Sequence, residues 1–491
     1  MSKLDLIKGS AGYFLSNITN RVLGFLFVVI ATRSVGASGY GLIALGLTVK
    51  GLTNNFGLFG LSFSSQKYLS GKYNINKRKY FGSMLYINIV IALFSFLILF
   101  FGNEYIAINF FNKPEFSLVL KLFSFAIVLG LPMSLLRAVL KAQKKVKLYF
   151  YTNLIESSSK LISLMLILVI HNKIVAISLA ILISSLCGFL ASVQFIYREN
   201  LIPQMKFDFD LVYTVLKTGS QFLLVGLGYY LVSQTDRLML GSLSTSESLG
   251  IYAVSASLAQ IPGTLHGSMV AVFMPTVSEL FKEENYDLIK ENYKFLNYLI
   301  GSINITIVIF YIIFGQEILF YLFNFEGEKI YYVFLLLSLK YLFGTLIGPT
   351  SSLLNMMNKH KVELFNTLIM LVVNVVLNYF LIIHYDVYGA VVGTLISVIL
   401  LNFMQIIQIY INFKFWVFNK NHIIMILPLV FFGGSYFLLD EYLFYNFYNR
   451  ITLFLASEIL FIIIIYYFLD ENYKNKFKNK LSDFWRKLNE K

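Results

Sequence analysis

The chain has 491 residues, of which 57% are hydrophobic and 17% aromatic, and its mean hydropathy is +0.71. Only 13% of the residues are charged, against about a quarter in ordinary soluble domains, so most of the chain cannot face water. The formal net charge of +14, in a chain this apolar, indicates membrane orientation and attraction to anionic lipid rather than nucleic-acid binding.

Hydropathy predicts helical spans along the whole chain. Long runs rich in Phe, Ile and Leu, with only seven prolines, indicate helices rather than the short alternating strands of a membrane barrel. A helix crosses the bilayer with about 20 mainly apolar residues. We therefore expect fourteen spans, at 10–35, 41–67, 80–102, 117–141, 149–171, 173–197, 212–236, 248–275, 293–315, 330–357, 363–385, 387–413, 421–440 and 447–469.

The first span is expected to stay in the mature protein. The residues before it resemble the start of a signal peptide, but the apolar run that follows is too long, contains Arg21 and lacks a small-residue cleavage site. The single cysteine, Cys187, excludes an intrachain disulfide. The five histidines form no HxxxH or HExxH pair, so we expect neither a metal site nor a bound cofactor.

The basic residues gather in alternate connections between spans. Most of them lie in the segments 70–80, 141–148, 198–211, 280–294, 358–361, 414–420 and the tail from Lys474. With an even number of spans, all of these fall on the side of both termini, which the positive-inside rule assigns to the cytoplasm. The connections are too short to hold a soluble catalytic domain, and 280–294 is expected to form a short interfacial helix.

Two pairs of similar segments indicate an internal repeat. Segment 140–153 resembles 354–367, and 32–47 resembles 235–258, where an arginine precedes a Gly-Tyr or Gly-x-Tyr at the start of the next span. An offset of six spans is even, so the two halves insert the same way up. This predicts an all-α integral membrane protein with two pseudo-symmetric six-helix lobes and two appended helices. The expected parts are an N-lobe at 1–197, a cytoplasmic linker at 198–211, a C-lobe at 212–413, and helices 13 and 14 with a basic cytoplasmic tail at 414–491.

Several cations lie inside the expected spans, where insertion scales give a cost of about 2.5–3.5 kcal/mol for a lysine or arginine at the helix centre. Such residues are rare unless they face a bundle interior or a water-filled cavity. Asn17, Asn20 and Arg21 form a polar stripe at mid-depth in the first span. The other expected members of a cationic cavity are Lys50, Arg137, Lys160 and Lys340.

A cavity with a positive excess suits a large anion. Pyrophosphate is the natural candidate, because guanidinium groups bind phosphate oxygens with two parallel hydrogen bonds and lysine adds point charge. The acids at depth are fewer, and Glu156 and Asp236 are the candidates for binding a coupling ion.

The charged candidates also have structural alternatives. Glu156 and Lys160 lie four residues apart on one helix and can neutralise each other. Arg137 lies nearer the cytoplasmic end of its span and can extend its guanidinium to the headgroups.

The remaining candidates also have structural alternatives, with the exception of Arg21. Asp236 can form a boundary pair with Arg237 at the outer interface, and Asn17 and Asn20 can make hydrogen bonds between helices. Arg21 is the hardest to explain as structural, because it is deep and no acid lies three or four residues from it.

The first span and the start of the second half resemble the Wzx-type polysaccharide flippases of the multidrug/oligosaccharidyl-lipid/polysaccharide exporter superfamily. In the first half the matching residues are Asn17, Asn20, Arg21, Phe25, Thr32, Arg33, Gly36, Tyr40 and Gly41. In the second half the Asp-Arg, Gly and Gly-x-Tyr of segment 236–262 match. The resemblance covers essentially the whole chain, and its short motifs indicate the family better than the substrate.

This resemblance implies two six-helix lobes around a central cationic cavity. The implied substrate is an undecaprenyl-pyrophosphate-linked oligosaccharide, a repeat unit of O-antigen, capsule or exopolysaccharide, moved to the outer leaflet by alternating access and coupled to a proton or sodium gradient. It also implies a monomer in the bacterial cytoplasmic (inner) membrane, with polysaccharide polymerase or assembly proteins as possible partners. The motif match assigns substrate contact to Arg21 and, less directly, a role to Asp236.

Three alternatives remain open at this point. A lipid II flippase and a drug/cation antiporter belong to the same superfamily, although an antiporter for cations should have carboxylates dominating its cavity. A membrane glycan polymerase or glycosyltransferase is a remote alternative, since such enzymes tend to need a large outer loop or a clustered acid or histidine site, which this sequence lacks. We therefore expect a transporter and not an enzyme.

Overall fold

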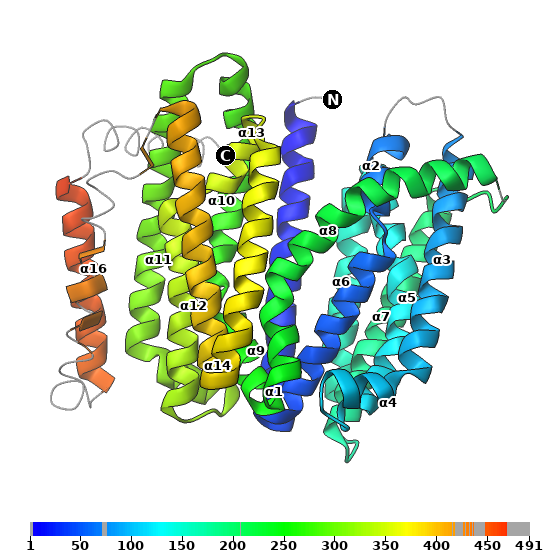
Figure 1. Cartoon of the computed structure of the whole chain (residues 1–491), viewed down its shortest axis with the longest axis horizontal. Helices are drawn as coiled ribbons and strands as arrows, with labels where there is room; N and C mark the ends of the chain where they lie inside the picture. Colours follow the sequence, from blue (N-terminus) through cyan, green and yellow to red (C-terminus); the bar gives the residue numbers. More distant parts are fainter. Residues whose placement is uncertain are drawn as a thin grey trace, which may run out of the picture. The chain divides into compact units, whose positions relative to one another are not determined.

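A computed structural model describes residues 3–70, 76–206, 208–414, 416–417, 426–427, 429–431, 433–434, 436 and 447–468. These residues are helical, with turns and short connections between the helices, and no strand occurs among them. Figure 1 shows the helices in their order along the chain. The expected all-α class is therefore confirmed.

Contacts divide the chain into two compact units, which we call unit 1 (residues 1–257 and 374–390) and unit 2 (residues 258–373 and 391–491). The helices that begin in unit 1 are α1 (Lys3–Gly57), α2 (Leu61–Ser70), α3 (Lys77–Phe101), α4 (Asn103–Tyr105), the π-helix η1 (Ile106–Phe110), α5 (Phe116–Ala142), α6 (Val146–Ile167), α7 (Lys173–Arg198), α8 (Phe209–Leu243) and α9 (Ser246–Ala259). Those that begin in unit 2 are α10 (Ile261–Lys282), α11 (Tyr286–Phe323), α12 (Glu328–Ile347), α13 (Thr350–Met356), α14 (His360–Phe413) and α16 (Phe447–Phe468). The lobe boundaries expected from the sequence remain a prediction.

Polar residues define where several of the long helices begin. Asn76, Asn172, Asp208 and Asn285 stand directly before α3, α7, α8 and α11, and each side chain accepts a backbone N–H of the first turn. Such caps satisfy donors that the helix itself leaves free. Among the described residues, seven helices are long and apolar enough to cross a membrane. The protein is a multi-pass membrane protein.

Two of these seven helices are each two helices joined at a kink. The chain turns within α1 at Gly36, whose φ is 67°, and within α14 at Asp386, whose φ is 55°. The expected span 10–35 and the first part of the span 41–67, as far as Gly57, therefore belong to α1, and 363–385 and 387–413 belong to α14.

Three expected spans are interrupted at residues that cannot continue a helix. The span expected at 41–67 ends at Gly57, because Phe59 and Gly60 take positive φ values. The span expected at 248–275 breaks at Gln260, which lies between α9 and α10 and two residues before Pro262. The span expected at 330–357 breaks at Gly348, whose φ is 91°.

Two further expectations, the interfacial helix at 280–294 and the span at 421–440, are not confirmed by the structure. The expectation of a separate interfacial helix at 280–294 is wrong. Helix α10 ends at Lys282, and α11 begins at Tyr286, directly after its cap Asn285, and runs for 38 residues. Most of the span expected at 421–440 lies outside the described residues.

The repeat expected from the sequence appears as matching turn geometry. Lys144 and Asn358 both take a left-handed conformation, and the residue after each donates its N–H to a carbonyl five residues back, at 2.9 Å and 2.8 Å. Asn200 and Lys414 are also left-handed. Each second member lies 214 residues after its counterpart (144 to 358, 200 to 414), which supports a duplicated helix plan.

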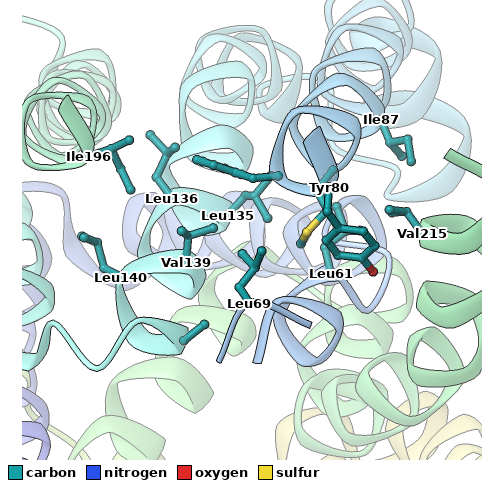
Figure 2. Close-up of a cluster of buried hydrophobic side chains, with 13 residues drawn as sticks. Leu61, Leu69, Tyr80, Ile87, Leu135, Leu136, Val139, Leu140, Ile196 and Val215 are labelled. Carbon is teal, nitrogen blue, oxygen red and sulfur yellow. The ribbon is translucent and has the colours of Figure 1, made fainter. Parts of the chain in front are cut away.

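Each unit has its own hydrophobic core. In unit 1, α5 packs against α7, α3 and α2, and α6 packs against α7 and α1. Figure 2 shows one buried cluster of this unit, in which Leu61, Tyr80, Leu135 and Val215 come from α2, α3, α5 and α8. The corresponding core of unit 2 includes Val277, Tyr293, Leu353 and Ile409. This packing fixes the helices that carry the charged residues of the first half.

Candidate functional site

Four charged side chains gather inside unit 1, and we call them the cationic cluster: Lys50 of α1, Arg137 of α5, and Glu156 and Lys160 of α6. All four are half-buried. The charges of Glu156, Lys160 and Arg137 all act on Lys50, so the four share one electrostatic environment. Three cations face one carboxylate, which leaves a formal charge of +2 within a helix bundle.

Arg137 and Glu156 form the one ion pair of the cluster. Arg137 Nη1 donates to Glu156 Oε2 at 2.6 Å, and Nη2 donates to the Thr152 carbonyl at 2.8 Å. The two side chains are 12% and 24% exposed. Arg137 therefore turns toward α6 rather than extending to headgroups, and it, not Lys160, is the hydrogen-bonded partner of Glu156.

The two lysines of the cluster make contacts that leave their charge in place. Lys50 Nζ donates to Ser185 Oγ of α7 at 2.9 Å. Lys160 Nζ lies 4.7 Å from the centre of the Phe27 ring of α1. A hydroxyl and an aromatic face hold an ammonium in position without neutralising it.

Small residues make room for the cluster. A Cβ atom at Gly188 would lie 2.6 Å from Met133 Sδ and 3.1 Å from Arg137 Nη2, so this glycine allows α7 to approach the ion pair. Two polar atoms, Nε of the cluster residue Arg137 and Oδ1 of the neighbouring Asn54, are buried without a hydrogen-bond partner in the described part of the chain. The cluster thus keeps unused hydrogen-bonding capacity.

The first-span candidates lie on α1, which packs against α6. Ser157 Oγ donates to Asn20 Oδ1 at 2.8 Å, so Asn20 makes the interhelical hydrogen bond considered as its structural alternative. Arg21, the next residue, is exposed. The side chain of Asn17 lies outside the described part of the structure.

Lys340 and Asp236 are not members of the four-residue cationic cluster. Lys340 belongs to α12 of unit 2, is half-buried, and has its Nζ 5.4 Å from the ring centre of Tyr341. Its convergence with the other cations remains a prediction. Asp236 of α8 is 3% exposed and accepts hydrogen bonds from the Tyr252 hydroxyl and, at 2.8 Å, from Asn378 Nδ2. This candidate for ion binding is a buried, hydrogen-bonded carboxylate of unit 1.

Sequence reasoning missed the partners that hold the lysines. Ser185 is 135 residues from Lys50, and Phe27 is one aromatic residue among many, so no spacing pattern points to either. It also missed Glu363 of α14, which is 2% exposed and accepts Gln405 Nε2 at 3.0 Å and 2.9 Å. Within the described residues, no three His, Cys, Asp or Glu side chains come together as a metal site requires.

The sequence matches a known family over more than half of its length. Residues 6–281 match the family described as "Polysaccharide biosynthesis protein". The chain belongs to this family. The protein that carries the cationic cluster is thus a member of the polysaccharide biosynthesis family.

Individual relatives and solved structures agree with this membership. An uncharacterized membrane protein of Methanocaldococcus jannaschii is 24% identical over 83% of this chain and 99% of its own length. A probable low-salt glycan biosynthesis flippase of Haloferax volcanii is 23% identical over 80% of this chain and 81% of its own length.

The solved structures show the fold. The lipid II flippase MurJ in an inward closed conformation matches with a TM-score of 0.73 and 15% identity, over 94% of this chain and 99% of that one. An inward-facing multidrug resistance MATE family transporter of the MOP superfamily matches with a TM-score of 0.63 and 13% identity, over 80% of this chain and 95% of that one. This member of the polysaccharide biosynthesis family therefore has the MOP fold, and its structural neighbours are transporters and flippases.

Proposed function

We propose that the chain is a flippase for a lipid-linked oligosaccharide and that the cationic cluster, together with Arg21, binds the pyrophosphate of that lipid. The observation that carries this proposal is the +2 excess of Lys50, Arg137 and Lys160 over Glu156 inside a helix bundle. Family membership and the glycan flippase among the relatives support the glycan part of the proposal.

The cluster chemistry suits a diphosphate. Arginine offers a planar fork of N–H donors and lysine a compact positive charge, and both interact more strongly with phosphate where water is scarce. The buried, partnerless Arg137 Nε is a donor of this kind. Arg21 is exposed on α1. The sugar would then stay in water and the polyprenyl tail in lipid.

The finer proposal follows from the sequence resemblance. The substrate is an undecaprenyl-pyrophosphate-linked repeat unit, moved from the cytoplasmic to the outer leaflet of the cytoplasmic membrane by a monomer with both termini in the cytoplasm. A proton or sodium ion entering at Glu156 or Asp236 weakens the grip on the phosphate and resets the protein. Polysaccharide polymerase and assembly proteins would take over the product.

The other transport candidates fit the charges differently. A drug/cation antiporter would bind a cation, which a cluster of net charge +2 repels. Lipid II is itself a polyprenyl-pyrophosphate-linked sugar, so the cluster suits it as well, and it remains the second candidate because the fold likeness to a lipid II flippase extends over 94% of the chain.

The test is complementation of a strain that lacks its surface-polysaccharide flippase. We expect Arg21→Ala to reduce polymer output at least tenfold and Arg21→Lys to retain part of it, because a lysine keeps the charge but loses the bidentate geometry. Arg198→Ala, at the exposed end of α7, is the matched control and should leave output unchanged. Full output from a normally expressed Arg21→Ala protein would contradict the proposal.

A further inference from the structure

One end of unit 1, away from the basic connections, is closed by direct backbone contact between the two repeats. This end holds the kink of α1, the turn between α8 and α9, and the connection before α5 (Figure 1). A Cβ atom at Gly41 would lie 1.9 Å from the Ser246 carbonyl oxygen. A Cβ atom at Gly250 would lie 1.8 Å from the Ala37 carbonyl oxygen. Each glycine thus contacts the backbone of the other repeat, and neither position has room for a side chain.

A buried lysine joins the same two repeats. Lys113, between η1 and α5, is 8% exposed, and its Nζ donates to the carbonyls of Gly241 at 2.5 Å and Ser244 at 2.6 Å. These carbonyls belong to the C-terminal end of α8, where helix carbonyls lack intrahelical donors and a cation is favourable. Burial lowers the pKa of the Lys113 ammonium, and these carbonyls accept hydrogen bonds from its charged form.

A carboxylate holds the α8–α9 turn from the side of α14. Asp386, the left-handed residue at the kink of α14, accepts hydrogen bonds from Ser244 Oγ and Ser248 Oγ. The Ser248 N–H in turn donates to Thr245 Oγ1 at 3.1 Å, which caps the start of α9. Asp386 therefore holds the α8–α9 turn in place. The carbonyls of Gly241 and Ser244 beside this turn accept the hydrogen bonds from Lys113.

We propose that Lys113, Gly41, Gly250 and Asp386 form a latch that closes this end of the protein, and that opening the latch is the step that releases the transported molecule. The proposal rests on the proposed flippase function only for the identity of that molecule. The Lys113 and glycine contacts link an element of the first repeat to one of the second, and they consist of hydrogen bonds and backbone contact. Each hydrogen bond to a charged group contributes about 1.5–3 kcal/mol net, because water takes its place when the contact opens, so the latch can open and close reversibly.

Labelling of a buried cysteine tests the latch without any substrate. In a Cys187→Ser background, Leu45→Cys places a thiol at a fully buried position against Gly241. We expect Lys113→Met to raise the rate of modification by a membrane-impermeant maleimide at least about tenfold, because the hydrogen bonds from Nζ to the carbonyls of Phe111, Gly241 and Ser244 are lost. Lys121→Met, an exposed lysine of α5, is the control. An unchanged rate in Lys113→Met would overturn the proposal.

Cross-linking tests whether the latch must open. The Lys113→Cys/Ser244→Cys double variant, joined by a short bifunctional methanethiosulfonate, should lose polysaccharide output and regain it on reduction. Undiminished output from quantitatively cross-linked protein would contradict an opening step. A chain whose Leu45→Cys label responds as expected, but which moves no lipid-linked glycan, would keep the latch and count against the flippase function.

Discussion

At the residue scale, the cationic cluster compensates its own desolvation only in part. A lysine at the centre of a span costs about 2.5–3.5 kcal/mol by insertion scales. The Phe27 face returns about 0.5–2 kcal/mol to Lys160, and a hydroxyl such as Ser185 returns a similar amount to Lys50. Glu156 is the one carboxylate among three cations. The remaining positive potential therefore favours binding of an anion and does not stabilise the folded protein.

The Arg137–Glu156 pair is expected to matter for stability as well. Arg137→Met leaves Glu156 half-buried without its partner, and breaking a buried pair in this way costs about 3–5 kcal/mol. The double variant Arg137→Met/Glu156→Leu removes both charges and should recover most of that loss. Thermal unfolding of the purified protein in detergent measures all variants, and the cycle gives the coupling free energy. A double variant no more stable than Arg137→Met would contradict the pairing.

At the element scale, the helices were predictable where an apolar run ends at polar residues. The expected span 117–141 coincides with α5 (Phe116–Ala142), and 173–197 with α7 (Lys173–Arg198), because Asn172 caps α7 and charged residues follow both helices. The interruption at Phe59–Gly60 was not predictable, because hydropathy does not report that a residue takes a left-handed conformation.

The site was predictable only as far as single helices allow. Arg21, Lys50, Lys160 and Lys340 were candidates because a cation inside an apolar run stands out in any sequence. Which atoms they touch depends on packing between helices far apart along the chain. The same limit applies to Lys113, which lies in a connection between expected spans and which the structure buries.

Close approach of α7 to the cluster gives a prediction at this scale. In Gly188→Ala the new methyl group meets Met133 and Arg137, so we expect overpacking to destabilise the protein by about 1–3 kcal/mol. Gly228→Ala in α8 is the matched control, because nothing lies within 4 Å of a Cβ there, and alanine favours the helix. The melting temperatures of the two variants should move in opposite directions. A Gly188→Ala protein as stable as the wild type would show that α7 and the ion pair are not in contact.

At the scale of the whole molecule, the two repeats carry different charges on a shared plan. The matching left-handed turns at Lys144 and Asn358 show the common plan, and the cationic cluster lies in unit 1. Unit 2 holds the buried carboxylate Glu363, whose two oxygens accept Gln405 Nε2. The proposed headgroup site thus belongs to unit 1. The latch glycines lie where the two repeats meet.

The measurement that tests the central claim most directly is translocation of a polyprenyl-pyrophosphate-linked oligosaccharide by the purified protein in proteoliposomes. Lys50→Met should lower the apparent affinity for this lipid about tenfold or more, since one charge-assisted contact to phosphate is lost, while the melting temperature stays the same or rises. Lys121→Met should behave as the wild type. If Lys50→Met moves the lipid with unchanged affinity and rate, the cationic cluster is not the headgroup site and the account fails.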